Sequence, residues 1–141
     1  MPAWLVKSDP EDYSAADLQR DRATDWTGVA SPAAQKNMRA MTPGDRVLVY
    51  HTGGEKAIVA TASVASAPQP DPADKSGKRV FIRLTFGKWL QTPVPLSAIK
   101  ADPAFKTFDL VRISRLSVMP VTAAHESRLL KLAGGESGRR P

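Results

Sequence analysis

The stretch AWLVKSDP at residues 3–10 brings a short apolar run, and the turn that ends it, to the very start of the sequence. Its β-forming residues predict a core strand over 3–7, and the acid–proline pair that follows predicts the end of that strand. The strand carries Lys7 and Ser8 to its own end. Because rigid folds commonly hold their binding groups at strand ends, both side chains are candidate ligand-binding residues.

The rest of the sequence predicts more strands and a few short helices. Apolar, β-branched stretches predict strands at 45–51, 57–67, 78–89 and 116–121. Capping residues and apolar stripes predict helices at 14–21, 33–40, 95–99 and from 122 onward. Turn residues and prolines predict a hairpin turn at 52–55 and a loop at 68–77, whereas 105–113 fits either a loop or a short strand. Since the strands are mostly consecutive, we expect an α+β fold with an antiparallel or mixed sheet, curled or barrel-like, rather than a doubly wound parallel sheet.

The size and composition of the chain predict one domain. The 141 residues, 42% of them hydrophobic, suit a single domain at residues 1–133 followed by a flexible tail at 134–141. The lack of cysteine excludes a disulfide framework and a thiolate metal site, and it fits a reducing compartment. No apolar run approaches ~18 residues and no secretory signal begins the sequence, so we expect a soluble, cytoplasmic protein without a membrane partner.

The common catalytic motifs are absent from the sequence. Neither a GxGxxG nor a GxxxxGK[ST] phosphate loop occurs, and a GxSxG elbow is missing. The two histidines, His51 and His125, are not spaced as metal ligands, so we expect no metal, no cofactor and no catalytic residue. A hydrolase built on Ser8, with Lys7 or His51 as its base, is the enzymatic alternative. The net charge of +6 favours a polyanionic partner such as nucleic acid.

The stretch WTGV at residues 26–29 is a second candidate site, in a predicted loop between two helices. Trp26 fits either a lid on the core or one wall of an aromatic pocket for a flat ligand. Gly28 allows the backbone to approach a ligand closely, and Ser31 begins a helix whose free amides favour electron-rich groups. The other two tryptophans, Trp4 and Trp89, fit core or rim packing.

These motifs resemble the EVE domain family. The resemblance rests on the two stretches above and on KNMRAM at 36–41, GDRVLVYH at 44–51 and LVRISRLSVMPV at 110–121, and it covers residues 3 to about 132. It implies a PUA-like fold, a curled mixed β-sheet or pseudo-barrel with short peripheral helices, related to the YTH reader domains. It also implies a non-catalytic pocket that accepts a modified nucleobase flipped out of its strand, usually a modified cytosine in DNA or else a modified base in RNA.

The resemblance also implies which residues form this pocket. The ligand-binding positions would be Lys7, Ser8, Trp26, Gly28, Val29, Ser31, Tyr50, His51, Arg115, Leu116 and Ser117. Phosphate contacts are expected from Arg39 and Arg112. The implied partner is nucleic acid that carries modified bases, and a reader without an effector domain would act by competition or with a separate effector such as a nuclease.

Two positions depart from the family pattern. Asp9 stands where the family usually has glutamate, and Ala30-Ser31-Pro32 stands where many members have Arg-Asn-Tyr or Arg-Asn-Pro. The absent arginine and asparagine remove contacts to a base edge or a phosphate. A small-molecule or free-nucleobase sensor on the same fold is therefore the alternative binding function.

Overall fold

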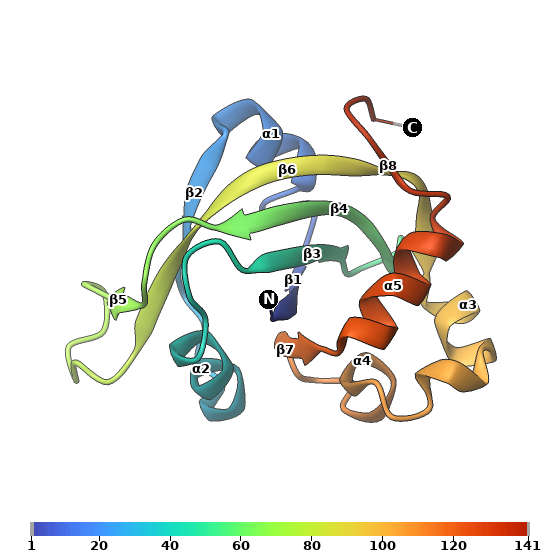
Figure 1. Cartoon of the computed structure of the whole chain (residues 1–141). Helices are drawn as coiled ribbons and strands as arrows, with labels where there is room; N and C mark the ends of the chain where they lie inside the picture. The colour runs from blue at the N-terminus through green and yellow to red at the C-terminus, as the bar shows by residue number, and fades with distance from the viewer. Residues whose placement is uncertain (1, 141) are drawn as a thin grey trace.

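The computed structural model describes residues 2–140, which form a curled sheet with short helices around it (Figure 1). The strands are β1 Ala3–Ser8, β2 Ala23–Trp26, β3 Arg46–His51, β4 Ala57–Val64, β5 Gln69–Pro70, β6 Val80–Pro95, β7 Val118–Val121 and β8 Glu136–Ser137. The helices are α1 Ala15–Asp21, α2 Pro32–Arg39, α3 Leu96–Ala101, the 3₁₀ turn η1 Pro103–Phe105, α4 Asp109–Arg112 and α5 Ala123–Leu132. Helices α3, α4 and α5 gather at one end of the sheet, away from α2 (Figure 1).

The sheet is mixed, with the strand order β2-β6-β4-β3-β1-β7, and β5 and β8 pair with β6 outside this path. Strand β1 runs parallel to β3 and antiparallel to β7, whereas β3, β4 and β6 pair antiparallel in sequence. The α+β, curled mixed-sheet fold predicted from the sequence is confirmed. The parallel register sets Lys7 opposite Tyr50 and Ser8 opposite His51, so the polar ends of two strands lie side by side.

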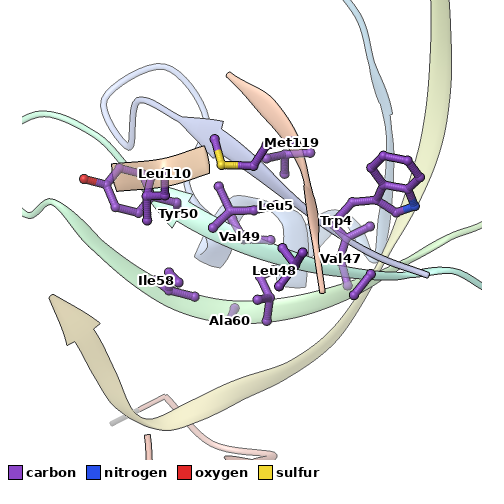
Figure 2. Packing of buried hydrophobic residues seen from close by; sticks show 14 of the residues in the cluster. Trp4, Leu5, Val47, Leu48, Val49, Tyr50, Ile58, Ala60, Leu110 and Met119 are labelled. Atoms are coloured by element: carbon purple, nitrogen blue, oxygen red, sulfur yellow. The ribbon is translucent and has the colours of Figure 1, made fainter. Parts of the chain in front are cut away.

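The core forms where β1 and β3 are covered on both faces. The side chains of Leu5, Val47, Leu48 and Val49 pack together there, with Met119 of β7 above Leu5 (Figure 2). Uninterrupted apolar runs are typical of such strands, because neither face meets water. Helix α2 adds its predicted buried stripe of Ala34 and Met38, with Met41 following in the turn. Trp4 lies in this core as predicted, and its indole N–H donates a 3.0 Å hydrogen bond to the buried Asp45 carboxylate.

Four predicted elements differ from those observed. Trp26, predicted in a loop, ends a strand, because residues 23–26 pair antiparallel with β6. Residues 109–112, predicted as loop or strand, form the single helical turn α4. Strand β6 continues past the predicted end at Trp89 to Pro95, and β4 ends at Val64 instead of residue 67.

The C-terminal segment, predicted as a flexible tail, contributes to the sheet. Strand β8 pairs with β6, with Glu136 opposite Leu90 and Ser137 opposite Trp89. The Gln91 N–H also donates to the Gly135 carbonyl at 2.8 Å. Among residues 2–140, no helix is both long enough and apolar enough to cross a membrane.

Candidate functional site

One cavity of about 450 Å³ collects residues from both predicted sites. Lys7 and Ser8 reach it from β1, Trp26 and its loop from β2, and Ser117 from the segment before β7. Three strands lie between β1 and β2 in the sheet order, so only the curl of the sheet brings their ends to one cavity. We call this space the Trp26 cavity; its other lining residues are Asp9, Asp12, Tyr13, Thr24, Asp25, Thr27, Gly28, Val29 and Ala30.

The Trp26 ring is held at the wall of this cavity by pairing and by an aromatic neighbour. Strand β2 places Trp26 opposite Ile82 of β6, which fixes its backbone. Tyr13 approaches the indole edge-on, with ring centroids 6.3 Å apart and an angle of 80°. The Tyr13 hydroxyl in turn donates a 2.8 Å hydrogen bond to Asp21 of α1. A half-buried indole that is fixed in this way is prepared to stack on a flat ligand.

The loop after Trp26 is fastened to its surroundings by two buried side chains. Gln35 of α2 donates from its amide nitrogen to the Val29 carbonyl at 2.8 Å, and its amide oxygen accepts from the Val80 N–H at 2.8 Å. The buried Asp71 carboxylate accepts from the Gly28 N–H at 3.5 Å. Gly28 adopts φ +75°, a conformation that favours glycine. Its amide faces Asp71, so we do not expect it to bind the ligand.

Lys7 is the cation at the boundary of the Trp26 cavity. Its ammonium donates a 2.8 Å hydrogen bond to the Ser114 carbonyl and lies 5.8 Å from the centre of the Tyr50 ring. Its backbone N–H donates to the Ser117 carbonyl at 2.9 Å, which ties the end of β1 to the start of β7. Partial burial lowers the pKa of Lys7 below its ordinary value of 10.5, because burial disfavours the charged amine.

Ser8 and His51, the pair required by a hydrolase, each form hydrogen bonds with other groups. The Ser8 hydroxyl donates to the Tyr13 carbonyl, so toward a ligand it is left with acceptor capacity. His51 is buried; its Nε2 accepts from the Ala15 N–H at 3.0 Å and its Nδ1 lies 2.6 Å from the Glu55 carboxylate. A backbone N–H can only donate, so Nε2 carries no proton and Nδ1 donates to Glu55. The nitrogen that would serve as base is therefore occupied, and the hydrolase alternative is not favoured.

Several other predicted site residues lie outside the Trp26 cavity. Ser31 is the N-cap of α2, and its hydroxyl accepts from the Ala34 N–H at 3.4 Å. Tyr50 and Leu116 are buried, because each packs against the core from a strand or turn. The three arginines proposed as ligand or phosphate contacts are exposed: Arg39, Arg112 and Arg115. Arg39 donates to the Lys78 carbonyl, and Arg112 pairs with Asp109 at 3.3 Å. The structure thus brings together Lys7, Ser8, Trp26, Gly28, Val29 and Ser117 from the predicted set.

The sequence prediction missed the acidic wall of the cavity. Asp9, Asp12 and Asp25 line it, and Asp25 pairs with Arg83 at 2.9 Å. The polar run DPEDY at 9–13 was the available signal, because it follows the predicted strand directly. Within residues 2–140, no three histidine, aspartate or glutamate side chains gather in a way that could hold a metal ion. The cavity can therefore bind a ligand by stacking on Trp26, by the charge of Lys7 and by hydrogen bonds to carboxylates.

The architecture and the cavity together define a small α+β domain, in which a curled mixed sheet borders a half-open cavity with one aromatic wall. The EVE domain profile matches residues 2–132, and the chain belongs to the EVE domain family. Thymocyte nuclear protein 1 from Gallus gallus is 28% identical over 163 aligned residues, which cover 92% of this chain and 67% of that protein.

Solved structures share the same fold. The NMR structure of a Rhodopseudomonas palustris protein has a TM-score of 0.91 at 40% identity and covers 95% of this chain and 94% of its own. A crystal structure from Agrobacterium tumefaciens has a TM-score of 0.92 at 30% identity, over 100% and 99% of the two chains. Human THYN1 protein, in complex with DNA that contains 5-methylcytosine, has a TM-score of 0.88 at 23% identity, over 97% and 100%.

Proposed function

We propose that this protein is a DNA-binding module that accepts a modified base, of the 5-methylcytosine class, in the Trp26 cavity. The observation that carries the proposal is the convergence of Lys7, Trp26 and Ser117 on one cavity, from the ends of β1 and β2 and from the segment before β7. A cavity of about 450 Å³ lies in the range of small-ligand sites, and it offers one aromatic wall beside polar groups. The human THYN1 complex supports DNA with 5-methylcytosine as the ligand class.

The lining residues of the Trp26 cavity match the polar groups of cytosine and the methyl group of 5-methylcytosine. Carboxylates accept hydrogen bonds from the exocyclic amine of cytosine, and Asp9 and Asp12 place two of them in the cavity. Val29 and Ala30 supply the apolar surface that a C5-methyl group needs. The Ser117 side chain can donate to a ring carbonyl.

Base flipping sets the energy that the cavity has to supply. Extruding a base from a duplex costs a few kcal/mol, and stacking on an aromatic side chain returns about 1–3 kcal/mol. Hydrogen bonds and phosphate contacts must therefore provide the remainder. A reader without a catalytic centre would act by competition for the modified site or through a separate effector protein such as a nuclease.

The first test is titration of tryptophan fluorescence with an oligonucleotide panel. The panel holds single- and double-stranded DNA and RNA, with and without 5-methylcytosine, 5-hydroxymethylcytosine and methylated adenine. Ligand-dependent quenching should report Trp26, because Trp4 and Trp89 are only 6% and 2% exposed. We expect selective quenching by DNA that contains a modified cytosine.

The matched variant is Trp26→Ala, which should weaken this binding by the stacking energy, about 1–3 kcal/mol. Trp89→Phe, a change inside the core on β6 and outside the Trp26 cavity, is the control and should retain selective binding. Equal binding of modified and unmodified DNA would contradict the proposal. Selective binding of a free nucleobase, with no dependence on salt, would point instead to the sensor function.

A further inference from the structure

A second cavity lies on the other side of Lys7. It measures about 210 Å³, and its lining includes Lys7, Tyr50, Thr52, Lys56, Lys100 and Ser114. Three of the described lining residues are lysines, and none of them is aspartate or glutamate. We call this space the lysine cavity. Lys7 lines both cavities, so it stands at the wall between them.

We propose that the lysine cavity binds a backbone phosphate of the same DNA strand whose base enters the Trp26 cavity. This inference rests on the proposed function, because it assigns the neighbouring part of the same ligand. The exposed arginines expected to hold phosphates play no part in it. The residues assigned here, Lys56 and Lys100, come instead from the turn after β3 and from the last turn of α3.

The charges of the two cavities separate the base from the phosphate. Asp9 and Asp12 give the Trp26 cavity an acidic side, which repels a phosphate and favours an amine-bearing base edge. The lysine cavity carries the opposite charge and attracts a phosphate. A strand that inserts its base beside Trp26 therefore lowers its electrostatic energy by turning its backbone toward Lys56 and Lys100.

Lys7 and Tyr50 have donor groups available for such a phosphate. An ammonium group has three protons, and Ser114 is the one hydrogen-bond acceptor found for Lys7 among residues 2–140. Figure 2 shows the Tyr50 hydroxyl at the outer end of the core cluster, pointing away from Leu5 and Val49. Burial raises the pKa of Tyr50 above its ordinary value, so its hydroxyl keeps the proton that it would donate.

Glu55, a carboxylate beside the lysines, forms no ion pair with Lys56 or Lys100 among the residues that the structure describes. Glu55 shares a neighbouring shallow cavity with Lys56 and Lys100. Its carboxylate, however, lies 2.6 Å from His51 Nδ1, and this hydrogen bond turns it toward the core side of the hairpin. Lys56 and Lys100 are exposed and therefore accessible to a ligand.

The experiment compares the double variant Lys56→Gln/Lys100→Gln with Lys88→Gln/Lys106→Gln. Both pairs remove two positive charges from exposed positions, but Lys88 and Lys106 lie outside the lysine cavity. The affinity for a 5-methylcytosine oligonucleotide is measured across a series of salt concentrations. Each lost phosphate contact lowers the salt slope by about 0.7 in single strands and about 0.9 in duplex DNA. Because the lysine cavity is assigned one phosphate, we expect the slope to fall by about 0.7 to 0.9 in the first variant and by less than half of that in the control.

The outcomes distinguish this inference from the proposed function. If both variants change the slope equally, the lysine cavity is not a phosphate site, even though selective binding of 5-methylcytosine persists. If wild type does not discriminate modified DNA but the slope change is specific to Lys56 and Lys100, the base reader fails and the phosphate site stands. A loss of affinity for free 5-methyl-dCMP alone, with oligonucleotide binding unchanged, would overturn the backbone assignment. Urea unfolding of each variant verifies that these surface changes leave the fold intact.

Discussion

At the scale of single residues, Lys7 links the two cavities, and its protonation should be coupled to binding. Burial lowers its pKa in the free protein, and a phosphate bound to its ammonium raises that pKa again. At a pH below the lowered pKa of the free protein, Lys7 is charged in both the free and the bound protein, so its titration does not affect the affinity. Above that value the free amine has lost a proton that the complex retains, so affinity should fall as pH rises toward and beyond 10.5.

This pH dependence is measured by titrating a 5-methylcytosine oligonucleotide from pH 7 to pH 10.5. The control is Lys7→Arg, because a guanidinium stays charged over the whole range and removes the contribution of this residue. The expected result is a steeper loss of affinity in wild type than in Lys7→Arg above the lowered pKa. Parallel curves for the two proteins would show that Lys7 does not contact the anion.

His51 should be a structural residue and not a ligand-binding one. His51→Phe removes the acceptor of the Ala15 N–H and leaves a buried donor without a partner. We expect a loss of about 1–3 kcal/mol in the free energy of unfolding, measured by urea denaturation. Glu55→Gln, whose amide oxygen can still accept from Nδ1, is the control and should cost well under that. Loss of DNA affinity without loss of stability in His51→Phe would contradict this assignment.

Which residues could be predicted from the sequence depended on how local their signal was. Lys7, Ser8 and Trp26 belong to short local patterns, so the sequence marked each of them as a candidate, and the family resemblance implied that they share one pocket. Gln35 looks like an ordinary polar residue of a helix in the sequence. It is buried because its side-chain amide forms hydrogen bonds with both β6 and the Val29 loop. Asp71 lies 43 residues from the Gly28 amide that it faces. A pattern over neighbouring residues cannot predict a hydrogen bond between residues so far apart in the sequence.

At the scale of elements, strand β6 depends on one close approach to β4. A Cβ at Gly87 would lie 2.8 Å from the Thr61 hydroxyl oxygen and 2.9 Å from its carbonyl oxygen. Since the carbonyl belongs to the β4 backbone, it cannot move aside cheaply. We expect Gly87→Ala to lower the free energy of unfolding by about 1–3 kcal/mol.

The control for this prediction is Gly54→Ala, in the hairpin turn, where an added Cβ meets nothing within 4 Å. It should be neutral or slightly stabilising, because alanine reduces the freedom of the unfolded chain. Thermal unfolding of both variants makes the comparison. Equal stability of the two would mean that β4 and β6 adjust at their bulge without cost.

The elements that the sequence did not reveal are short or gain their structure from pairing. Strand β2 has only four residues, ATDW, and becomes a strand because β6 supplies its hydrogen bonds. Helix α4 is a single turn, which is too short to show a helical period. The alternating apolar pattern that predicted β6 stops at Trp89, but the strand continues through Pro93 to Pro95. The strong apolar runs of β1 and β3, by contrast, made their burial predictable.

At the scale of the whole molecule, the curl of the sheet creates the site. The ends of β1 and β2 belong to strands separated by β6, β4 and β3, and they meet only because the long β6 bends around the core (Figure 1). The sequence predicted a curled sheet, but neither the parallel pairing of β1 with β3 nor the strand order has a local signature. The family resemblance therefore implied part of the lining of the Trp26 cavity, but it also implied Tyr50 and Arg115, which lie outside it, and it did not indicate the acidic wall.

The C-terminal segment is part of the fold because β8 pairs with the long, bent strand β6. Truncation of the chain at two positions tests this. Ending the chain after Ala133 removes β8 and the acceptor of the Gln91 N–H, and it exposes the edge of β6 beside the buried Trp89. Ending it after Gly138 keeps β8 and serves as the control. We expect the first truncation to cost about 1–3 kcal/mol of unfolding free energy in urea, and the second to cost much less. Binding of DNA should persist in both, since the Trp26 cavity lies on other strands. Identical unfolding midpoints for both truncations and the full chain would mean that the segment behaves as the flexible tail that its composition predicts.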